Sequence, residues 1–249
     1  MKNSLVSIIT PLYNSEEYIS ETIESVLSQS HQNWEMIIVD DCSTDNGVKI
    51  IEQYADNDDR IKLIKMKKNK GAAVARNMAI KKAEGRYIAF LDSDDIWHQD
   101  KLKKQIRFML ENNYSFTFTS FKKITELGDT FDVIKVPKKA SYRRVLFINP
   151  IDCSTVIYDK NSLGKIYMPD IRKRQDYALW LKILKNVDHG YGLNEQLTFY
   201  RVRENSLSNN KLDLIKYHWK LYRDIEKLSI VESSFYLLCD ILSKVLKIK

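Results

Sequence analysis

The sequence predicts an α/β fold with a mostly parallel central sheet flanked by helices, and three observations support this prediction. Short apolar runs rich in β-branched residues alternate with amphipathic stretches through the first half of the chain, which is the pattern of βαβ units. Carboxylates directly follow two of these runs, where open α/β sheets bind their ligands. Hydrophobic residues make up 44% of the 249 residues, with only 7 Gly and 4 Pro, which is typical of a packed globular chain.

The first half of the chain is predicted to contain four strands with a helix after each of the first three. Apolar runs with polar boundaries predict strands at residues 5–10, 35–39, 61–65 and 87–91. Apolar positions at helical spacing predict helices at residues 16–29, 48–54 and 72–83. Each connection then packs a helix on the sheet, as in a parallel crossover.

The second half is less regular and ends in a helical segment. Its pattern predicts a helix at 101–112, strands at 115–121, 131–136, 154–158 and 196–202, a helix at 175–185, and two helices from Lys211 to the end. Three polar residues at 208–210 precede these last helices and indicate a boundary. We therefore expect one domain over residues 1–208 and a helical tail over residues 209–249.

Net charge, cysteine spacing and apolar runs indicate which classes of partner and which cellular location to expect. The formal net charge of +7 favours an anionic partner, such as a nucleotide, a nucleic acid or an anionic membrane. No helix-turn-helix, zinc-finger or RNP-like pattern accompanies the basic residues, so we expect no nucleic acid partner. Cys42, Cys153 and Cys239 lack paired spacing and are expected to be reduced thiols. With no long apolar run and no signal-peptide pattern, we expect a cytoplasmic protein.

An acidic segment follows the fourth predicted strand. Three carboxylates, Asp92, Asp94 and Asp95, come directly after the apolar run that ends at Leu91. Carboxylate oxygens with no Cys or His nearby suit a hard cation such as Mg²⁺ or Mn²⁺, which in turn can hold a phosphorylated ligand. The alternative is a solvated turn in which Asp94 or Asp95 caps the next helix, and this segment alone leaves both open.

A second acidic pair, Asp40 and Asp41, ends the second predicted strand. Ionised carboxylates there can accept hydrogen bonds from a base N–H, such as uracil N3, and from ribose hydroxyls. The alternative is that Asp41 or Ser43 caps the next helix and Asp40 is structural. The first turn, residues 10–15, contains no glycine, which disfavours the G-x-G-x-x-G turn of NAD and FAD proteins.

Four segments in a fixed order resemble the nucleotide-binding half of family 2 glycosyltransferases, which have the GT-A fold. They are residues 6–14 (VSIITPLYN), 37–45 (IIVDDCSTD), 71–77 (GAAVARN) and 90–95 (FLDSDD). Residues 174–181 (RQDYALWL) resemble the acceptor-side motif of the family, with Gln175 in place of a Glu. Residues 200–208 resemble its closing segment, with Arg203 where a His is frequent. The resemblance implies a Rossmann-like GT-A domain, with a nucleotide-binding half at 1–100 and an acceptor half at 101–208.

The resemblance also assigns roles to single residues. It implies that Thr10, Pro11 and Tyr13 line the nucleoside pocket, that Asp41 binds uracil N3, and that Arg76 lies near the base or the phosphates. It further implies that Asp92 and Ser93 face the ribose and donor sugar, that Asp94 is the metal ligand, and that Asp176 is the catalytic base. Structural alternatives remain, since Tyr13 can simply pack, Arg76 can simply pair with a surface acid, and Trp180 fits a core better than a sugar platform.

The resemblance implies an inverting transferase that moves a sugar from a UDP-sugar to a saccharide or lipid-linked saccharide acceptor in bacterial surface glycan synthesis. One base and no second nucleophile fit single displacement, by analogy with inverting glycosidases. A nucleotidyltransferase is an alternative, but it usually has a Gly-rich basic loop after the first strand. A non-catalytic nucleotide-sugar-binding protein that kept the fold is another. His98 lies just beyond the acidic segment, within reach of a metal, but is interpreted as a helix-start residue, and the other three histidines have no partner at ligand spacing, so none is assigned to the chemistry.

The tail, residues 211–249, carries a net charge of +3. Its last helix places apolar residues at spacings of three and four, with three lysines near its end: Val231, Phe235, Leu238, Leu242 and Val245, then Lys244, Lys247 and Lys249. A basic amphipathic helix can lie in a membrane interface, which predicts peripheral contact with the inner face of the cytoplasmic membrane. The alternative is a helix that packs on the domain.

Overall fold

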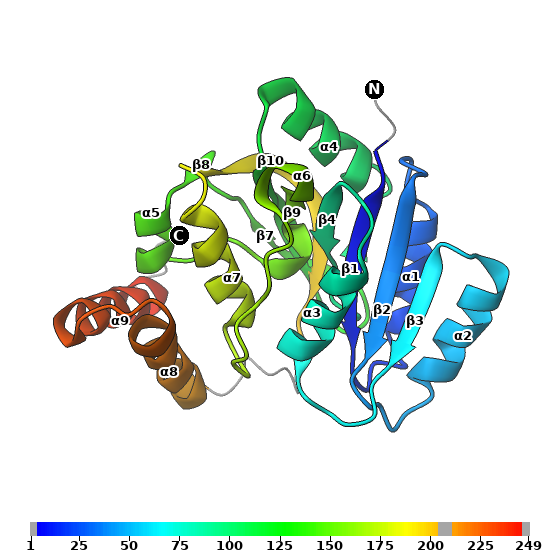
Figure 1. Cartoon of the computed structure of the whole chain (residues 1–249), viewed down its shortest axis with the longest axis horizontal. Helices are drawn as coiled ribbons and strands as arrows, with labels where there is room; N and C mark the ends of the chain where they lie inside the picture. Colours follow the sequence, from blue (N-terminus) through cyan, green and yellow to red (C-terminus); the bar gives the residue numbers. More distant parts are fainter. Residues whose placement is uncertain (1–3, 204–210, 246–249) are drawn as a thin grey trace.

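The structure is a computed structural model of the chain, and it describes residues 4–203 and 211–245. Its centre is a ten-stranded sheet with the strand order β3-β2-β1-β4-β9-β6-β10-β5, in which β7 also pairs with β6 and β8 with β10 (Figure 1). The strands are β1 (Val6–Leu12), β2 (Trp34–Asp40), β3 (Ile61–Lys65), β4 (Tyr87–Phe90), β5 (Ile96–Trp97), β6 (Phe116–Ile124), β7 (Thr130–Ile134), β8 (Lys139–Ala140), β9 (Ile157–Asp159) and β10 (Gly190–Arg201).

Helices cover both faces of this sheet (Figure 1). They are α1 (Ile19–Leu27), α2 (Gly47–Asn57), α3 (Ala72–Lys82), α4 (Lys101–Asn112), α5 (Tyr142–Phe147), α6 (Lys160–Leu163), α7 (Gln175–Leu184), α8 (Lys211–Lys220) and α9 (Ile230–Val245), with a 3₁₀ turn at Cys153–Thr155 and a π-helical turn at Leu221–Ile225. Two buried apolar clusters result, one joining α3 and α7 to the sheet and the other joining α1, α2 and α4 to it.

The parallel half of the fold is as predicted. Strands β3, β2, β1 and β4 are mutually parallel, and α1, α2 and α3 connect them. The register pairs Leu12 with Asp40 and Ile9 with Phe90, so the carboxyl ends of β1, β2 and β4 share one edge of the sheet. The two acidic segments therefore lie at the same edge, where ligands of open α/β sheets bind.

The second half adds antiparallel strands that make the sheet mixed. Strand β9 pairs antiparallel with both β4 and β6, and β7 pairs antiparallel with β6. Strand β10 begins at Gly190 rather than at the predicted residue 196. A Cβ on Gly190 would meet the Phe116 ring, and a Cβ on Gly192 would meet the carbonyl of Pro137, so this part of the strand requires glycine. Glycine is uncommon in strands, and for this reason the sequence pattern did not predict a strand here. The short helix α5 was not predicted, because six residues are too few for a helical period to show.

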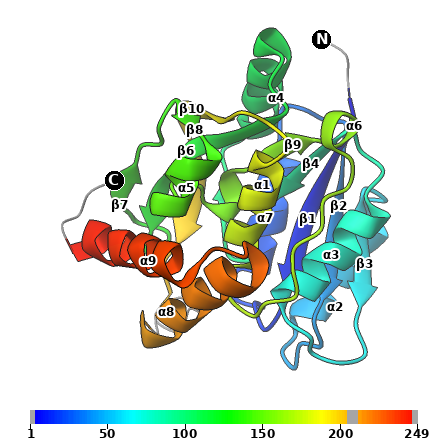
Figure 2. The same cartoon turned by 60° about the vertical axis from the view of Figure 1, so that its left-hand side comes forward.

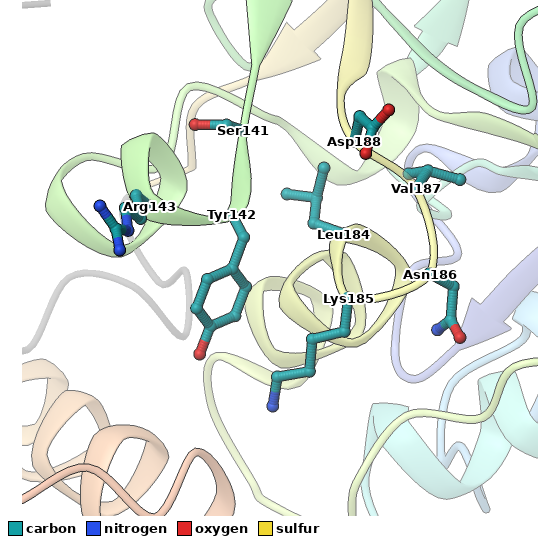
Figure 3. Close-up of a pocket in the computed structure, with 8 residues that line it drawn as sticks. All are labelled: Ser141, Tyr142, Arg143, Leu184, Lys185, Asn186, Val187 and Asp188. Carbon is teal, nitrogen blue, oxygen red and sulfur yellow. The ribbon is translucent and has the colours of Figure 1, made fainter.

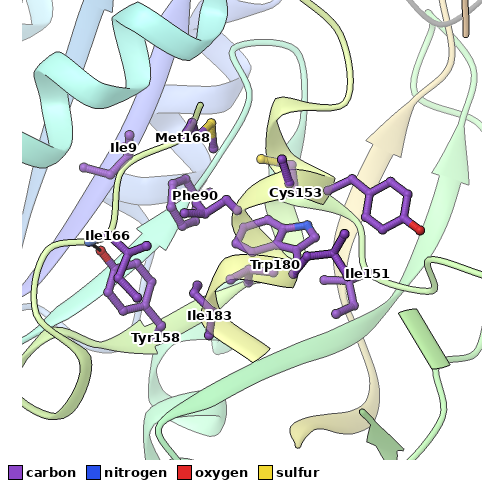
Figure 4. Packing of buried hydrophobic residues seen from close by; sticks show 14 of the residues in the cluster. Ile9, Phe90, Ile151, Cys153, Tyr158, Ile166, Met168, Trp180 and Ile183 are labelled. Atoms are coloured by element: carbon purple, nitrogen blue, oxygen red, sulfur yellow. Dashed lines mark hydrogen bonds between the residues drawn. The ribbon is translucent and has the colours of Figure 1, made fainter. Parts of the chain in front are cut away.

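Trp180 lies in the core beneath the carboxylate-bearing edge. Its indole is fully buried, makes an edge contact with Phe90 at 5.4 Å and stacks on Phe116 at 5.7 Å between ring centroids. Figure 4 shows it among Phe90, Cys153 and Ile183. The core alternative for Trp180 therefore holds, and the indole anchors α7 against the end of β4.

The tail packs on α5 and α7 rather than standing apart from the domain. Figure 2 shows α9 beside α5, with α8 next to α9. The ring of Phe147 on α5 contacts Phe235 on α9 at 5.6 Å, and Lys185 pairs with Glu226 at 2.6 Å.

The predicted pair of tail helices is confirmed. The side chains of Lys244 and Val245, the residues Lys247 and Lys249, and the boundary at 208–210 lie outside what is described. None of the described helices is long and apolar enough to cross a bilayer.

Replacing Trp180 with alanine tests its place in the core. We expect Trp180→Ala to lower the free energy of unfolding by about 3–5 kcal/mol, because a large buried ring is lost and a cavity remains. Urea unfolding followed by circular dichroism measures this. Trp219→Ala is the matched control, because Trp219 on α8 is exposed, and it should cost less than about 1 kcal/mol. Equal costs for the two variants would contradict the core assignment.

Candidate active site

The loops after β1 and β2 are joined to each other by hydrogen bonds. The backbone N–H of Asn14 donates to the Ser43 hydroxyl at 3.0 Å, and the Thr44 N–H donates to the Asn14 side-chain oxygen at 2.8 Å. Asn14 has a φ of +46°, a left-handed conformation that Asn tolerates better than most residues. These bonds form one continuous rim at the carboxyl end of the sheet, beside the half-exposed ring of Tyr13.

Arg76 on α3 reaches the acidic segment after β4. Its guanidinium donates to the Asp92 carboxylate at 2.5 Å, and its side chain is buried. Burial lowers the pKa of Arg76, but Asp92, Cys153 and Asp176 raise it above its usual value, so the group is a permanent cation. Arg76 therefore pairs with an acid, and that acid is Asp92 of the candidate site, so its role toward the base or the phosphates stays a prediction.

Asp95 holds the acidic segment in place. One carboxylate oxygen accepts from the Ser154 hydroxyl at 2.5 Å and the other from the backbone N–H of Arg201 at 2.9 Å. Burial and the charge of Asp94 raise the pKa of Asp95 well above its usual range. Asp95 is nearly inaccessible, whereas the side chains of Asp92 and Asp94 are 29% and 17% exposed. Asp92 and Asp94 are therefore the two carboxylates of the segment that a ligand can reach.

Asp94 has an arginine as its present partner. Arg203, just beyond β10, lies with its Nε 2.7 Å from the Asp94 carboxylate. Burial raises the pKa of Asp94 and so does Asp92, while Arg203 opposes them. Arg201 donates to the Asp94 backbone carbonyl at 3.0 Å and to Glu21 at 2.6 Å. Two arginines at the end of β10 thus hold Asp94 in position.

The oxygen ligands at this edge fit a divalent cation that also binds a phosphorylated ligand. Mg²⁺ is commonly held by one or two carboxylates together with substrate phosphates, rather than by a cage made only of protein. Asp92 and Asp94 supply such carboxylates. Among residues 4–203 and 211–245 no three Asp, Glu, His or Cys side chains gather into a ready-made metal cage. The donor set therefore suits Mg²⁺ or Mn²⁺ in company with a diphosphate.

Residues 174–181, which resemble the acceptor-side motif, bring Asp176 close to Arg76 and Asp152. Asp176 lies in the first turn of α7, which follows Arg174 in a left-handed conformation with φ of 65°. Its charge raises the pKa values of Arg76 and Asp152, so it lies within electrostatic reach of both. The structure thus brings a residue from the second half of the chain to the carboxylates and the arginine of the first half.

Asp152 belongs to this cluster and was missed from the sequence. Burial, Asp92 and Asp176 raise its pKa to about 8, and its carboxylate accepts from the Ser154 N–H at 3.2 Å at the start of the 3₁₀ turn. Asp152 therefore carries a proton at neutral pH more often than an ordinary Asp does. A single acid in an irregular segment gives no pattern that could have identified it.

Several predicted nucleotide-binding residues have structural contacts in this structure. The Asp41 carboxylate accepts the backbone N–H groups of Lys70 and Gly71, both at 2.7 Å, and so holds the start of α3. The Ser93 hydroxyl donates to that of Ser15 at 3.0 Å. Thr10 is fully buried, whereas Pro11 is partly exposed. Their roles toward a nucleotide stay predictions.

A hollow of about 600 Å³ lies elsewhere, beside the other end of α7. Figure 3 shows Tyr142 and Lys185 among the residues that line it. Helix α7 has ten residues, so the hollow and Asp176 lie at opposite ends of a helix roughly 15 Å long. The hollow contains none of the predicted site residues.

Known proteins with similar sequences are glycosyltransferases. The model of the family "Glycosyl transferase family 2" matches residues 7–157. TuaG of Bacillus subtilis (strain 168), whose name places it in teichuronic acid biosynthesis, is 48% identical over 93% of this chain and 92% of its own length. WfgD of Escherichia coli, described as a UDP-Glc:alpha-D-GlcNAc-diphosphoundecaprenol beta-1,3-glucosyltransferase, is 41% identical over 90% of this chain and 87% of its own.

Solved structures agree with the fold. Residues 1–349 of TarS from S. aureus, in complex with UDP-GlcNAc, superpose with a TM-score of 0.72 at 25% identity, over 93% of this chain and 70% of that one. The mannosyltransferase PcManGT from Pyrobaculum calidifontis, in complex with GDP-Man and Mn²⁺, gives a TM-score of 0.70 at 16% identity, over 93% and 69%. From its motifs, its fold and these relatives, the chain belongs to glycosyltransferase family 2.

Proposed function

We propose that this glycosyltransferase moves a sugar from a UDP-sugar to a lipid-linked saccharide in bacterial surface glycan synthesis, with inversion at the transferred sugar. The observation that carries the proposal is the convergence on Arg76, where Asp92 of the donor half is hydrogen-bonded and Asp176 of the acceptor half is within electrostatic reach. Donor and acceptor groups then lie on two sides of one site. The family membership argues against the nucleotidyltransferase alternative.

The choice of substrates rests on the relatives. WfgD and WfaP of Escherichia coli are both named for transfer from UDP-Glc to a diphosphoundecaprenol-linked GlcNAc, and this chain is 41% and 44% identical to them. TarS was solved with UDP-GlcNAc. A UDP-sugar donor and a polyprenyl-diphosphate-linked acceptor are the substrate classes that these similarities favour. We further propose that the protein works at the inner face of the cytoplasmic membrane, because such an acceptor is embedded in a bilayer.

The donor side is proposed to work by charge neutralisation. Cleaving the donor leaves negative charge on a diphosphate, and a Mn²⁺ or Mg²⁺ ion held by Asp94 would neutralise that charge when bound. Arg203 lies beside Asp94 and Arg76 beside Asp92, so two guanidinium groups are placed to donate to phosphate oxygens. Tyr13 is half-exposed at the rim, where its ring can stack on a base.

The acceptor side is proposed to depend on Asp176. An acceptor hydroxyl is a poor nucleophile, and a carboxylate that takes its proton as it attacks typically contributes about 10²–10⁴-fold to the rate. Asp176 is partly exposed at the start of α7, so an acceptor can reach it. Trp180, one turn later, holds this helix end against β4 through Phe90. The proton leaves the acceptor oxygen as the bond to the sugar forms and the bond to the diphosphate breaks.

Removing the Asp94 carboxylate tests the donor side. We expect Asp94→Ala to weaken Mn²⁺-dependent UDP binding and transfer together, by roughly 100-fold or more, because the ion that would neutralise the diphosphate in both bound UDP and the transition state loses its protein ligand. Calorimetry with UDP, with and without Mn²⁺, measures the first and turnover of a UDP-sugar the second. Asp129→Ala, in the exposed turn between β6 and β7, is the matched control. Normal metal-dependent binding by the Asp94 variant would exclude Asp94 as the ligand.

Replacing the Asp176 carboxylate with an amide tests the acceptor side. We expect Asp176→Asn to keep the affinity for UDP and to lower kcat by about 10²–10⁴-fold, because the near-isosteric change removes only the proton acceptor. Asp170→Asn, an exposed position six residues earlier, is the control and should leave kcat unchanged. A variant that loses UDP binding in parallel with kcat would move Asp176 to the donor side.

A further inference from the structure

Helix α9 packs a mixed side against the protein, where Tyr236 and Leu237 contact the buried apolar cluster, and it leaves a row of apolar side chains outward. Three polar residues, Ser233, Asp240 and Ser243, are buried, and Asp240 pairs with His218 of α8 at 3.2 Å. The outward residues are 46% to 79% exposed and lie at spacings of four, three and four, and they are Val231, Phe235, Leu238 and Leu242. A surface helix of a globular protein normally buries its apolar stripe. Four exposed apolar side chains in a row on one helix mark the outer side of α9 as a contact surface.

Helix α5 extends this surface and adds positive charge. The half-exposed ring of Phe147 packs edge-on against Phe235 at 5.6 Å and against Tyr236 at 5.0 Å. Arg143 and Arg144 precede Phe147 by four and three residues, so they lie one turn earlier on the same side of α5, and both are exposed. We call Arg143, Arg144, Phe147, Val231, Phe235, Leu238 and Leu242 the α5–α9 face.

The positive charge of the α5–α9 face favours an anionic lipid surface over a second copy of the chain as its binding partner. Helix α5 has no acidic residue, and α9 has only Glu232 and the buried Asp240. In a two-fold contact between copies of the chain the same patch meets itself, and this patch offers only Glu232 as an exposed acid to pair with its arginines. An anionic lipid surface offers phosphates to the arginines and an apolar boundary to the side chains of α9.

The face is fixed relative to the candidate active site. Tyr177, directly after Asp176, donates its hydroxyl hydrogen to the backbone carbonyl of Val145 in α5 at 2.6 Å. Tyr222, at the turn before α9, donates to the carbonyl of Leu146 at 3.0 Å. Both hydroxyls are buried with their rings, so α5, the start of α7 and the tail hold one arrangement. A surface that docks on α5 and α9 is thereby held at a set position from Asp176.

We propose that the α5–α9 face docks on an anionic lipid bilayer and sets the position of the acceptor side relative to it. The proposal rests on the proposed function, since only a lipid-linked acceptor requires this alignment. Phe147 and the apolar side chains of α9 enter the boundary between headgroups and acyl chains, and Arg143 and Arg144 bind the headgroup phosphates. The hydrogen bonds of Tyr177 and Tyr222 transmit this position to α7.

Vesicle sedimentation of the full chain tests the proposal, with phosphatidylcholine vesicles that contain or lack phosphatidylglycerol. We expect binding only to the anionic vesicles, and Arg143→Glu with Arg144→Glu should weaken it by at least about 25-fold, because each basic residue contributes about a five-fold factor. A triple serine variant at Val231, Leu238 and Leu242 should lose binding as well. The matched control changes Leu127, Phe131 and Val133 to serine on the β6–β7 hairpin, where they are 43% to 92% exposed, and should bind normally.

A second readout separates this proposal from the proposed function. Hydrolysis of a UDP-sugar without acceptor should be unchanged in the variants of the α5–α9 face, since none of these residues is in the candidate active site. If the variants of the α5–α9 face still bind vesicles normally while the enzyme turns over, the docking proposal is overturned and the proposed function stands. Vesicle binding without any turnover would leave the docking proposal standing and contradict the proposed function. A dimer on light scattering that the triple serine variant disrupts would assign the face to a second copy and overturn the docking proposal.

Discussion

The buried carboxylate of Asp95 is the constraint on which the site depends. It links three distant parts of the chain, because it accepts from Ser154 before β9 and from the backbone of Arg201 at the end of β10. The side chain of Arg201 in turn reaches the Asp94 carbonyl and Glu21 on α1. A buried carboxyl group left without such partners would cost about 1–3 kcal/mol. Asp92 and Asp94 can face a ligand because Asp95 and Arg201 fix the backbone on which they stand.

Charge balance explains the arrangement of the remaining groups. Asp92, Asp94, Asp152 and Asp176 are close enough to shift one another's or a neighbour's pKa, and a cluster of carboxylates repels itself. Arg76 pairs with Asp92 and Arg203 pairs with Asp94. We propose that a nucleoside diphosphate with a divalent ion enters by exchanging these pairs, so that the arginines bind phosphate. The two ion pairs hold the carboxylates in place until the ligand arrives, and the metal ion and the phosphates then replace these partners.

The sequence allowed the placement of functional groups to be predicted wherever regular strands carry them. Asp92 and Asp94 follow β4 directly, so their edge of the sheet could be predicted from the parallel crossovers. The partners of Asp41 could not, because its bonds to the backbone at Lys70 and Gly71 join residues about thirty positions apart. Asp152 has no neighbouring pattern, and its raised pKa comes entirely from burial and from residues far along the chain. The amphipathic pattern of α9 was visible, but a helical period cannot show which side faces the protein.

The most direct test of this account is a crystal structure with UDP and Mn²⁺, in which anomalous scattering identifies the metal. The account predicts one Mn²⁺ bound by the Asp94 carboxylate and the diphosphate, with Arg203 no longer paired with Asp94 and Asp176 facing the sugar side of the diphosphate. A Mn²⁺ ion bound away from Asp94, or UDP bound while the Asp94–Arg203 pair stays intact, would contradict it.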